Sequence, residues 1–345
     1  MLLLIYIKIS SWRAQQKNKK GSCFMSRIDE GISEMLKDLK EGILQDLLNK
    51  LTNDDTLELE FRTGYLSIYY RGGCVSKLVH KDVNCYEDYF DENYNKEREI
   101  NPEDEGKNQK LQGEIKSSED CKAFVKEIIN RKEIMNSFFA KIPKREREFQ
   151  QLIERENNDN KESNFYISDI EYARENNRFD MLAVQRIDGK PYNELKLSII
   201  EMKYGAKAIG DKCGIYEHYL GVKNLTKEAI EDIIEDTEVS MQCKNELKLI
   251  KAKDYIERGI KIVNNEEIDL IFLISGITLK HNQKLLEELD KVNADLKENN
   301  KISNTNIKLN VGIFCTYLAG NVMYDKDILS IDDFFKLHEF RKNLN

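Results

Sequence analysis

Two acids and a lysine lie in or directly after apolar runs of the sequence, and side chains of these types could hold a metal ion and stabilise negative charge. Asp180 lies inside one apolar run, and Glu201-Met202-Lys203 closes the next one. Because side chains alternate along a strand, Glu201 and Lys203 point to one face and Met202 to the other. These charges therefore lie where a buried strand reaches its C-terminal end, which is where α/β sheets tend to place ligand sites.

The E-x-K spacing recurs elsewhere in the chain, so the spacing alone does not identify a site. Only the copy at Glu201 ends an apolar strand, and only this copy follows an acid, Asp180, that lies inside another apolar strand. The other copies fall in polar, turn or helical patterns, where a solvated face explains them. They are Glu105-Gly106-Lys107, Glu114-Ile115-Lys116, Glu194-Leu195-Lys196 and Glu246-Leu247-Lys248.

The arrangement around Asp180 and Glu201 resembles the αβββαβ core of the PD-(D/E)xK nuclease superfamily. An acid in one strand, a turn, and then E-x-K at the end of the next strand, with a helix on either side, is similar to that core. The run 165–173 resembles its first core strand, and the Gly-bearing stretch 204–220 resembles the connection to its second helix. The match covers about half of the chain, and Phe179 stands where the family name has Pro.

The resemblance implies metal-dependent hydrolysis of phosphodiester bonds in nucleic acid, DNA rather than RNA. Mg²⁺ prefers oxygen ligands and keeps several waters, so the carboxylates of Asp180 and Glu201 suffice to hold it, with Mn²⁺ as a substitute. By the same resemblance, the backbone carbonyl of Met202 adds a further ligand. The ammonium of Lys203 would then stabilise the developing negative charge or orient the attacking water.

Other acids could join this metal site. The resemblance implies an acid from the first helix, and Glu148 and Glu154 are the two choices in the helix predicted at 144–157, with Glu148 preferred. Asp169 and Glu171 are two positions apart, so they share one face of their strand and would reach the site if that face is turned towards it. A solvated salt bridge is the alternative interpretation for each of these acids.

Three further residues are interpreted as substrate-binding. Arg178 and His218 flank the predicted site in the sequence, and Arg71 follows two tyrosines in Tyr69-Tyr70-Arg71. Aromatic rings beside a cation could stack on bases. Each has a structural alternative, because a lone histidine often packs or caps a helix, and tyrosines beside a hairpin turn often belong to a core.

Two interpretations without catalysis compete with the nuclease prediction. Asp180, Glu201 and Lys203 could form a salt-bridge cluster at a sheet edge, although a buried trio of charges is tolerated only with well-placed partners. The chain could also be a degenerate nuclease fold that binds nucleic acid or a protein without cutting. Divalent metal and the substitutions Lys203→Ala and Asp180→Ala would separate these alternatives from catalysis.

The elements of the first half can be predicted from apolar periodicity. Residues 28–51 have helical spacing, and 57–70 alternate as a strand pair with a turn at Thr63-Gly64. Residues 74–79 add a third strand, and a helix is predicted at 119–140. The first half therefore reads as an α+β module.

The second half predicts a mixed central sheet flanked by helices, which places the chain in the α/β class. After the helix at 144–157, the pattern alternates between strand-like runs and helical spacing. The late apolar runs suit central strands that are covered on both faces. The predicted strands are 165–173, 178–186, 195–204, 268–275 and 308–317, with helical pattern between 215 and 255.

These elements divide the chain into three parts. Residues 1–24 are interpreted as a tail or a misassigned start, because basic residues follow the short apolar opening instead of preceding it. Residues 25–118 form the α+β module, with a polar linker at 91–118, and residues 119–345 form the nuclease-like domain. The module would position substrate, or bind a protein partner or a second copy of the chain.

Composition narrows the range of partners. A formal net charge of −8 argues against a wholly basic nucleic-acid coat but leaves room for a local basic groove. The 7 cysteines form no C-x-x-C pair and no zinc-like cluster, which indicates reduced thiols and a cytoplasmic protein. No stretch supplies the roughly 20 apolar residues of a membrane span. Restriction, defence and repair roles are all compatible with these features.

Overall fold

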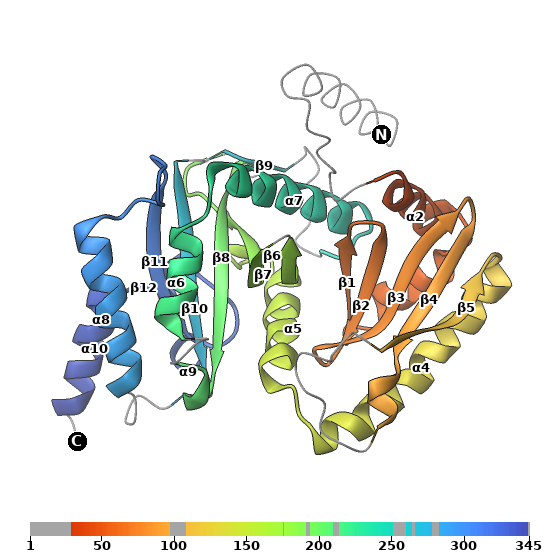
Figure 1. Ribbon diagram of the computed structural model, residues 1–345, viewed down its shortest axis with the longest axis horizontal. Helices are drawn as coiled ribbons and strands as arrows, with labels where there is room; N and C mark the ends of the chain where they lie inside the picture. Colours follow the sequence, from red (N-terminus) through yellow and green to blue (C-terminus); the bar gives the residue numbers. More distant parts are fainter. Residues whose placement is uncertain are drawn as a thin grey trace.

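Two β-sheets and the helices packed against them make up the part of the chain that the structure describes (Figure 1). The structure is a computed structural model, and its fold is mixed α/β, as the sequence predicts. The predicted tail at 1–24 lies outside the described residues. The described residues are 29–96, 108–174, 176–190, 194–209, 214–250, 260–263, 266–277 and 283–343.

The first sheet is an antiparallel meander in the N-terminal module. The predicted strand pair and third strand are confirmed, with the turn at Gly64, which has a φ of +79°. The helix predicted at 28–51 is instead two helices, because the backbone turns to an extended conformation at Gly42 (φ −120°, ψ −150°), which ends the first one. The elements are α2 (Glu30–Glu41), α3 (Gln45–Asn53), β1 (Leu57–Arg62), β2 (Tyr65–Tyr70), β3 (Gly73–Asp82), β4 (Cys85–Asp91), η1 (Glu92–Asn95) and β5 (Gln109–Ile115).

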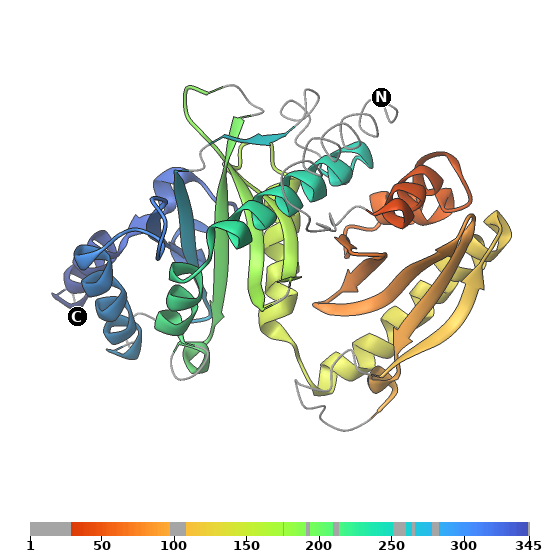
Figure 2. The ribbon, with the colours of Figure 1, turned by 45° about the horizontal axis from the view of Figure 1, so that its top comes forward.

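The helix α4 (Ser118–Lys141) belongs to the N-terminal module and not to the second domain as predicted. Ser117 caps its start by accepting a hydrogen bond from the Asp120 N–H. Its apolar face, including Phe124, Ile128 and Phe139, is buried in the core of the first sheet. The helix runs along the side of that sheet that faces away from the second sheet (Figure 2). The module boundary therefore falls after α4.

The segment predicted as a linker at 91–118 contains η1 and β5, so that prediction is wrong for residues 92–95 and 109–115. Strand β5 pairs with β4 at the edge of the sheet, but its residues from Lys110 to Glu114 are exposed. Because neither face of this stretch is covered, the sequence there carries no apolar alternation. Its backbone pairing with β4 holds this stretch, together with the buried Ile115 at its end and the ion pair between Lys110 and Glu92.

The second sheet has the order β12-β11-β10-β8-β7-β6, with β9 beside the start of β8. Strands β6, β7 and β8 pair antiparallel, and β8, β10 and β11 pair parallel, so the predicted mixed sheet is confirmed. Its strands are β6 (Phe165–Arg174), β7 (Asn177–Arg186), β8 (Glu194–Tyr204), β9 (Lys261–Ile262), β10 (Glu267–Ser275), β11 (Lys308–Cys315) and β12 (Leu329–Ser330).

Helices lie on both faces of the second sheet. Leu182 and Ile199 face one side, where they pack with residues of α6, α7 and α8, whereas Met181 and Ile200 face the other side with Ile153 of α5. The helical pattern between 215 and 255 divides into two helices, because Thr226 caps the start of the second. The helices are α5 (Arg145–Asn158), η3 (Ala206–Ala208), α6 (Ile215–Lys223), α7 (Lys227–Glu246), α8 (Gln283–Glu298), α9 (Thr316–Ala319), η6 (Asp325–Asp327) and α10 (Ile331–Asn343).

Helix α5 lies between the two sheets (Figure 1), and most of its buried residues are polar. Asn158 accepts from the Ile167 N–H at 2.8 Å and donates to the Ile167 carbonyl at 2.9 Å, where the β6 register shifts. Asn157 accepts from the Met323 N–H at 2.7 Å. These bonds give buried amides the partners that they need inside a protein.

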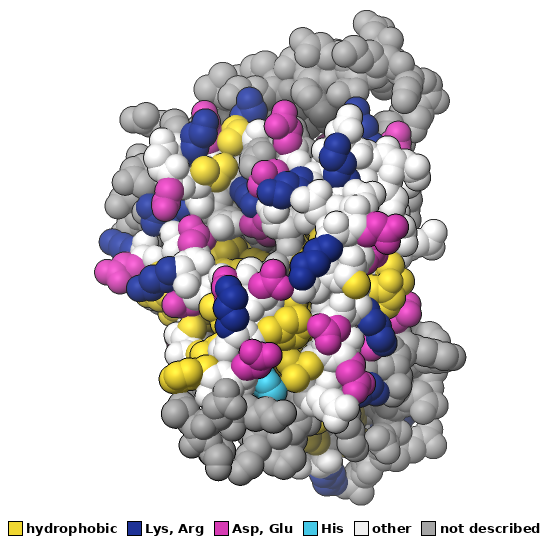
Figure 3. Space-filling model, turned by 90° about the vertical axis from the view of Figure 1, so that its left-hand side faces the viewer, with side chains coloured by type: hydrophobic (Ala, Val, Ile, Leu, Met, Phe, Trp, Pro, Cys, Tyr) yellow, Lys and Arg dark blue, Asp and Glu magenta, His cyan; other side chains and the backbone are white. Residues whose placement is uncertain are grey.

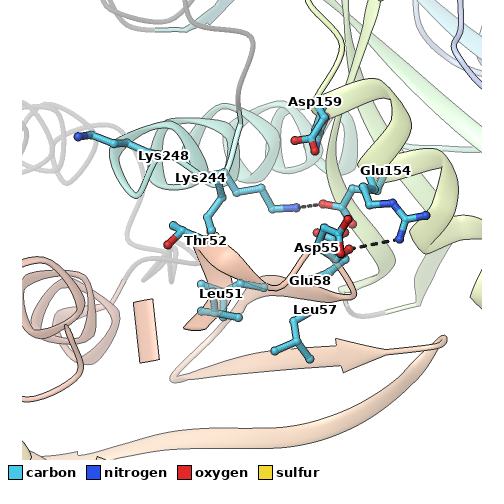
Figure 4. Close-up of a pocket in the computed structure, with 13 residues that line it drawn as sticks. Leu51, Thr52, Asp55, Leu57, Glu58, Glu154, Asp159, Lys244 and Lys248 are labelled. Atoms are coloured by element: carbon cyan, nitrogen blue, oxygen red, sulfur yellow. Dashed lines mark hydrogen bonds and ion pairs between the residues drawn. The ribbon is translucent and has the colours of Figure 1, made fainter. Parts of the chain in front are cut away.

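Buried ion pairs join the N-terminal module to the second domain. Lys244 of α7 lies 2.9 Å from Glu60 of β1 and also pairs with Glu154 of α5, beside a pocket lined by both parts of the chain (Figure 4). Arg62 of β1 lies 2.7 Å from Asp169 of β6. Burial raises the pKa of Glu60 and Glu154, and Lys244 opposes that rise.

The end of α7 also crosses to the N-terminal module. Cys243 and Leu247 are buried in the same apolar cluster as α2, α3 and α4, and Leu249 packs against it. The N-terminal core is therefore completed by residues that come much later in the chain. None of the helices in the described residues is long and apolar enough to cross a membrane.

Removing the ammonium at this junction should destabilise the whole chain. In Lys244→Met, Glu60 and Glu154 lose their shared cation while staying buried, and breaking a buried pair in this way costs about 3–5 kcal/mol. The control is Lys227→Met on the same helix, because the Lys227 side chain is 71% exposed and its pair with Glu231 is solvated. Urea unfolding of both variants, followed by circular dichroism, measures the difference. Equal midpoints would contradict a stabilising role for Lys244.

Candidate functional site

The structure brings Asp180, Glu201 and Lys203 together at the C-terminal end of β8. The ladder between β7 and β8 ends at the pair Met181 and Ile200, and the Asp180 carboxylate continues it by accepting the Met202 N–H at 2.8 Å. Asp180 is two residues from Leu182, and Glu201 two residues from Ile199, so both acids lie on the sheet face that α6 covers. Asp180 is half-buried in the structure.

Burial and like charge dominate the electrostatics of this trio. Glu201 is 1% exposed and Lys203 is 3% exposed. Burial raises the pKa of Glu201 to about 7, although Lys203 draws it down. Burial and the neighbouring charge of Glu201 hold the pKa of Asp180 well above its usual range, again against the pull of Lys203. Two carboxylates beside one ammonium therefore leave the site short of positive charge.

His218 of α6 contacts Glu201 directly. Its Nδ1 atom lies 2.6 Å from Glu201 Oε2, and the histidine side chain is 28% exposed. The sequence suggests a substrate-binding role for His218, but the structure places its ring on a buried carboxylate. A ring nitrogen in this position fixes the orientation of the Glu201 carboxylate.

Glu146 is a further acid at this site, and the sequence interpretation did not select it. It lies in the first turn of α5, and its Oε2 atom accepts the Tyr204 N–H at 3.3 Å, one residue beyond Lys203. Its charge raises the pKa of both Asp180 and Glu201. A sequence signal existed, because Glu146 precedes Phe149 by three positions and Ile153 by seven, which puts it on the apolar stripe of that helix.

The acid preferred from the sequence, Glu148, faces the N-terminal module instead. Its Oε1 atom lies 2.8 Å from the Arg71 Nε atom, so these two predicted site residues pair with each other. Two residues apart on a helix, Glu146 and Glu148 point in different directions, and only one can face the sheet end. The alternative acid Glu154 pairs with Lys244 at the module junction.

The remaining sequence candidates lie around the site rather than in it. Asp169 pairs with Arg62, whereas Glu171 lies 3.2 Å from Arg147 and its charge raises the pKa of Asp180. Glu171 has a φ of +53°, outside the extended region, so the strand does not alternate regularly between these two acids. Arg178 lies exposed two residues before Asp180.

Tyr69 and Tyr70 do not form the exposed stacking surface that the sequence suggests. Tyr70 is buried in the N-terminal core and donates to Asn136 at 2.9 Å, while Tyr69 packs against the core beneath α5. On the opposite side of the molecule, positive and negative side chains are interspersed over the described part of the face formed by α8 and α10 (Figure 3). That pattern differs from the basic stripe of a nucleic-acid footprint.

The carboxylate oxygens of this site suit a hard cation, although the side chains are not arranged with their oxygens around a common point. Among the described residues, no group of three or more histidines, cysteines, aspartates and glutamates is arranged to hold a metal ion. The Met202 N–H and His218 engage one oxygen each of Asp180 and Glu201. Mg²⁺ prefers oxygen ligands such as carboxylates, and the acids of this site outnumber its ammonium group. The residues therefore fit this ion by their chemistry.

Comparison with known protein families, curated protein sequences and solved structures finds no match to this chain. The function therefore has to be inferred from the geometry of the site.

The charge at Glu201 should make stability depend on pH in a predictable direction. Because its pKa rises from 4.5 to about 7, the folded protein binds this proton more tightly than the unfolded chain, and stability falls as pH rises through that window. In EDTA at about pH 8, the free energy of unfolding of Glu201→Gln should therefore exceed that of wild type by about 1–3 kcal/mol. At about pH 5 the two free energies should differ little.

Chemical unfolding at the two pH values measures this effect. The matched control is Glu217→Gln, because Glu217 is exposed on α6 beside His218. A Glu201→Gln variant less stable than wild type at the higher pH would refute the charge repulsion described above.

Proposed function

We propose that the chain is a Mg²⁺-dependent nuclease built on a core like that of the PD-(D/E)xK superfamily. The observation that carries the proposal is the half-buried Asp180 beside the buried Glu201 and Lys203 at the end of β8. The order α5, β6, β7, β8, α6 and β10, with β6 to β8 antiparallel and β10 parallel to β8, supports an αβββαβ core.

The residues of the site divide the chemistry between them. Asp180 and Glu201 would hold Mg²⁺ or Mn²⁺, with Glu146 as the acid from the first helix in place of Glu148. When bound, the ion lowers the pKa of a water and polarises the scissile phosphate. Lys203 places its ammonium where negative charge grows on the phosphate oxygens, in a site from which water is largely excluded. His218 orients Glu201 through the contact at 2.6 Å.

DNA is the proposed substrate rather than RNA, following the resemblance, and a cytoplasmic role in restriction, defence or repair is compatible with it. Arg178 is exposed beside Asp180, where it would meet the backbone of the substrate. Arg71, in contrast, is engaged by Glu148, so we no longer assign it to substrate binding.

A non-catalytic binding module is the second candidate function, and β5 is the observation that favours it. This edge strand is exposed over Lys110–Glu114, and Leu111 is 51% exposed. Exposed edge strands offer unpaired backbone groups to another strand, from a protein partner or from a second copy of the chain. The two functions differ in their dependence on Lys203.

Cleavage of plasmid and single-stranded DNA in Mg²⁺ or Mn²⁺ tests the catalytic proposal. Lys203→Met and Asp180→Asn should each reduce the rate by about 100-fold or more, since each removes a group that stabilises charge in the transition state. The matched control is Lys116→Met. Lys116 belongs to another E-x-K copy at the end of a strand, β5, but its side chain is exposed. This control should cleave as wild type does.

Equal degradation by wild type and both site variants would indicate a contaminating nuclease and refute the assignment. Binding of DNA without metal-dependent cleavage, unchanged in Lys203→Met, would favour the non-catalytic module.

A further inference from the structure

We infer that the turn between β2 and β3, Arg71-Gly72, is a positioning element of the candidate active site. It packs against α5 and thereby fixes the position of Glu146. This inference rests on the proposed function. It makes the N-terminal module part of the nuclease site rather than an appended unit.

The turn approaches the α5 backbone more closely than any side chain would allow. Gly72 has a φ of +75°, and a Cβ atom added to it would lie 2.4 Å from Arg147 Cβ and 2.6 Å from the Glu148 nitrogen. Carbon atoms do not approach so closely without displacement, and a left-handed φ is strained for any residue with a Cβ. Glycine is therefore the residue that permits this contact.

Hydrogen bonds then fix the turn on the helix. The Gly72 N–H donates to the Gln151 side-chain oxygen, and Arg71 Nε donates to Glu148 Oε1 at 2.8 Å. Arg71 itself has a φ of +49°, so two consecutive residues adopt the left-handed region to make this fit. Strained backbone of this kind persists only where surrounding contacts enforce it.

The helix turn that receives Gly72 is the one that carries Glu146. Arg147 and Glu148, the residues under the turn, directly follow Glu146 in the chain. On its other side this helix end meets β8, where Glu146 accepts the Tyr204 N–H and the rings of Phe149 and Tyr204 lie 5.7 Å apart. The first turn of α5 is thus held between the Arg71-Gly72 turn and the strand that bears Glu201 and Lys203.

A second contact from the same helix turn reaches the site from the β6 side. Arg147 lies 3.2 Å from Glu171, whose charge acts on Asp180. A shift of α5 would therefore move Glu146 and the Arg147 and Glu171 pair together. Because misplacement by about 1 Å costs catalytic sites roughly 100-fold, even a small displacement should register.

The test compares two glycine substitutions in the full-length chain. Gly64→Ala is the matched control, since Gly64 also occupies a hairpin turn of the first sheet with a φ of +79°, but a Cβ atom there would lie 3.5 Å from Asp29 Oδ2, an ordinary contact. Both variants impose left-handed strain on alanine. Only Gly72→Ala also collides with α5.

Three quantities are measured. The hydrogen-exchange rates of the amides at 148–152 report the packing of α5, the Mn²⁺ affinity reports the arrangement of the acids, and the rate of DNA cleavage reports activity. The amides at 148–152 should exchange faster in Gly72→Ala, and this variant should bind Mn²⁺ about 10- to 100-fold more weakly. Losses of this size are typical when a group that orients a metal ligand is removed. Gly64→Ala should match wild type in all three.

A double-mutant cycle separates positioning from a general loss of structure. If the turn acts chiefly through Glu146, Gly72→Ala should weaken Mn²⁺ binding by a clearly smaller factor once Glu146→Gln is present, the remainder coming from the Arg147 and Glu171 pair. Should Gly72→Ala fail to fold, Arg71→Met keeps the glycine, removes the ion pair with Glu148, and should shift exchange and Mn²⁺ binding in the same direction by a smaller factor.

The outcomes for this inference and for the proposed function are distinct. A folded Gly72→Ala protein with the exchange and Mn²⁺ affinity of Gly64→Ala overturns the inference, even if wild type cleaves DNA. Wild type that neither binds Mn²⁺ nor cleaves overturns the proposed function together with the role of Glu146. Independent effects of Gly72→Ala and Glu146→Gln in the cycle also overturn the inference, because the turn would then act elsewhere.

Discussion

The burial of a polar helix between two sheets is the constraint on which much of this structure depends. Helix α5 presents amides and carboxylates to both sheets, and such groups are stable inside a protein only when each finds a partner. Several of them find partners on different sides of the helix: Gly72 for Gln151, Lys244 for Glu154, and strand β6 for Asn158. The exception among the described amides of α5 is Gln150, whose buried side chain makes no hydrogen bond. The two halves of the chain therefore hold each other in one arrangement, since sliding either sheet along α5 would leave several of these groups without partners.

The same helix connects that constraint to the chemistry at the end of β8. A stable protein avoids placing three acids near one another, yet the charge of Glu146 raises the pKa of both Asp180 and Glu201, and the charge of Glu201 raises that of Asp180 further. Arrangements that disfavour the folded state locally persist where function requires them and where the surroundings are rigid enough to enforce them. Here the rigidity comes from a buried β8, covered by α6 on one face and by α5 on the other.

Local patterns in the sequence were sufficient for strands β1 to β3, β6 to β8, β10 and β11, but not for β4, β5 or the two-residue strands β9 and β12. They were also sufficient for the central trio, because alternation along β7 and β8 already determines which side chains share a face. They were insufficient wherever tertiary packing decides. The apolar stripe of α4 predicts a helix but cannot say which sheet it covers, and β5 has no stripe because nothing covers its middle. The choice between Glu146 and Glu148 depended on the direction from which α5 meets the sheet, and the role of Gly72 depended on a helix that follows it only much later in the sequence.

The crossing of α7 into the N-terminal core has a consequence for how the chain forms during translation. The first sheet and α2 to α4 leave the ribosome well before Cys243 and Leu247, whose side chains fill part of that same core. Proteins of this size commonly fold one domain after another as they emerge. In this chain, the nascent N-terminal module would keep an apolar surface open until α7 is synthesised, so it depends on its own C-terminal half, or on a chaperone, to close it.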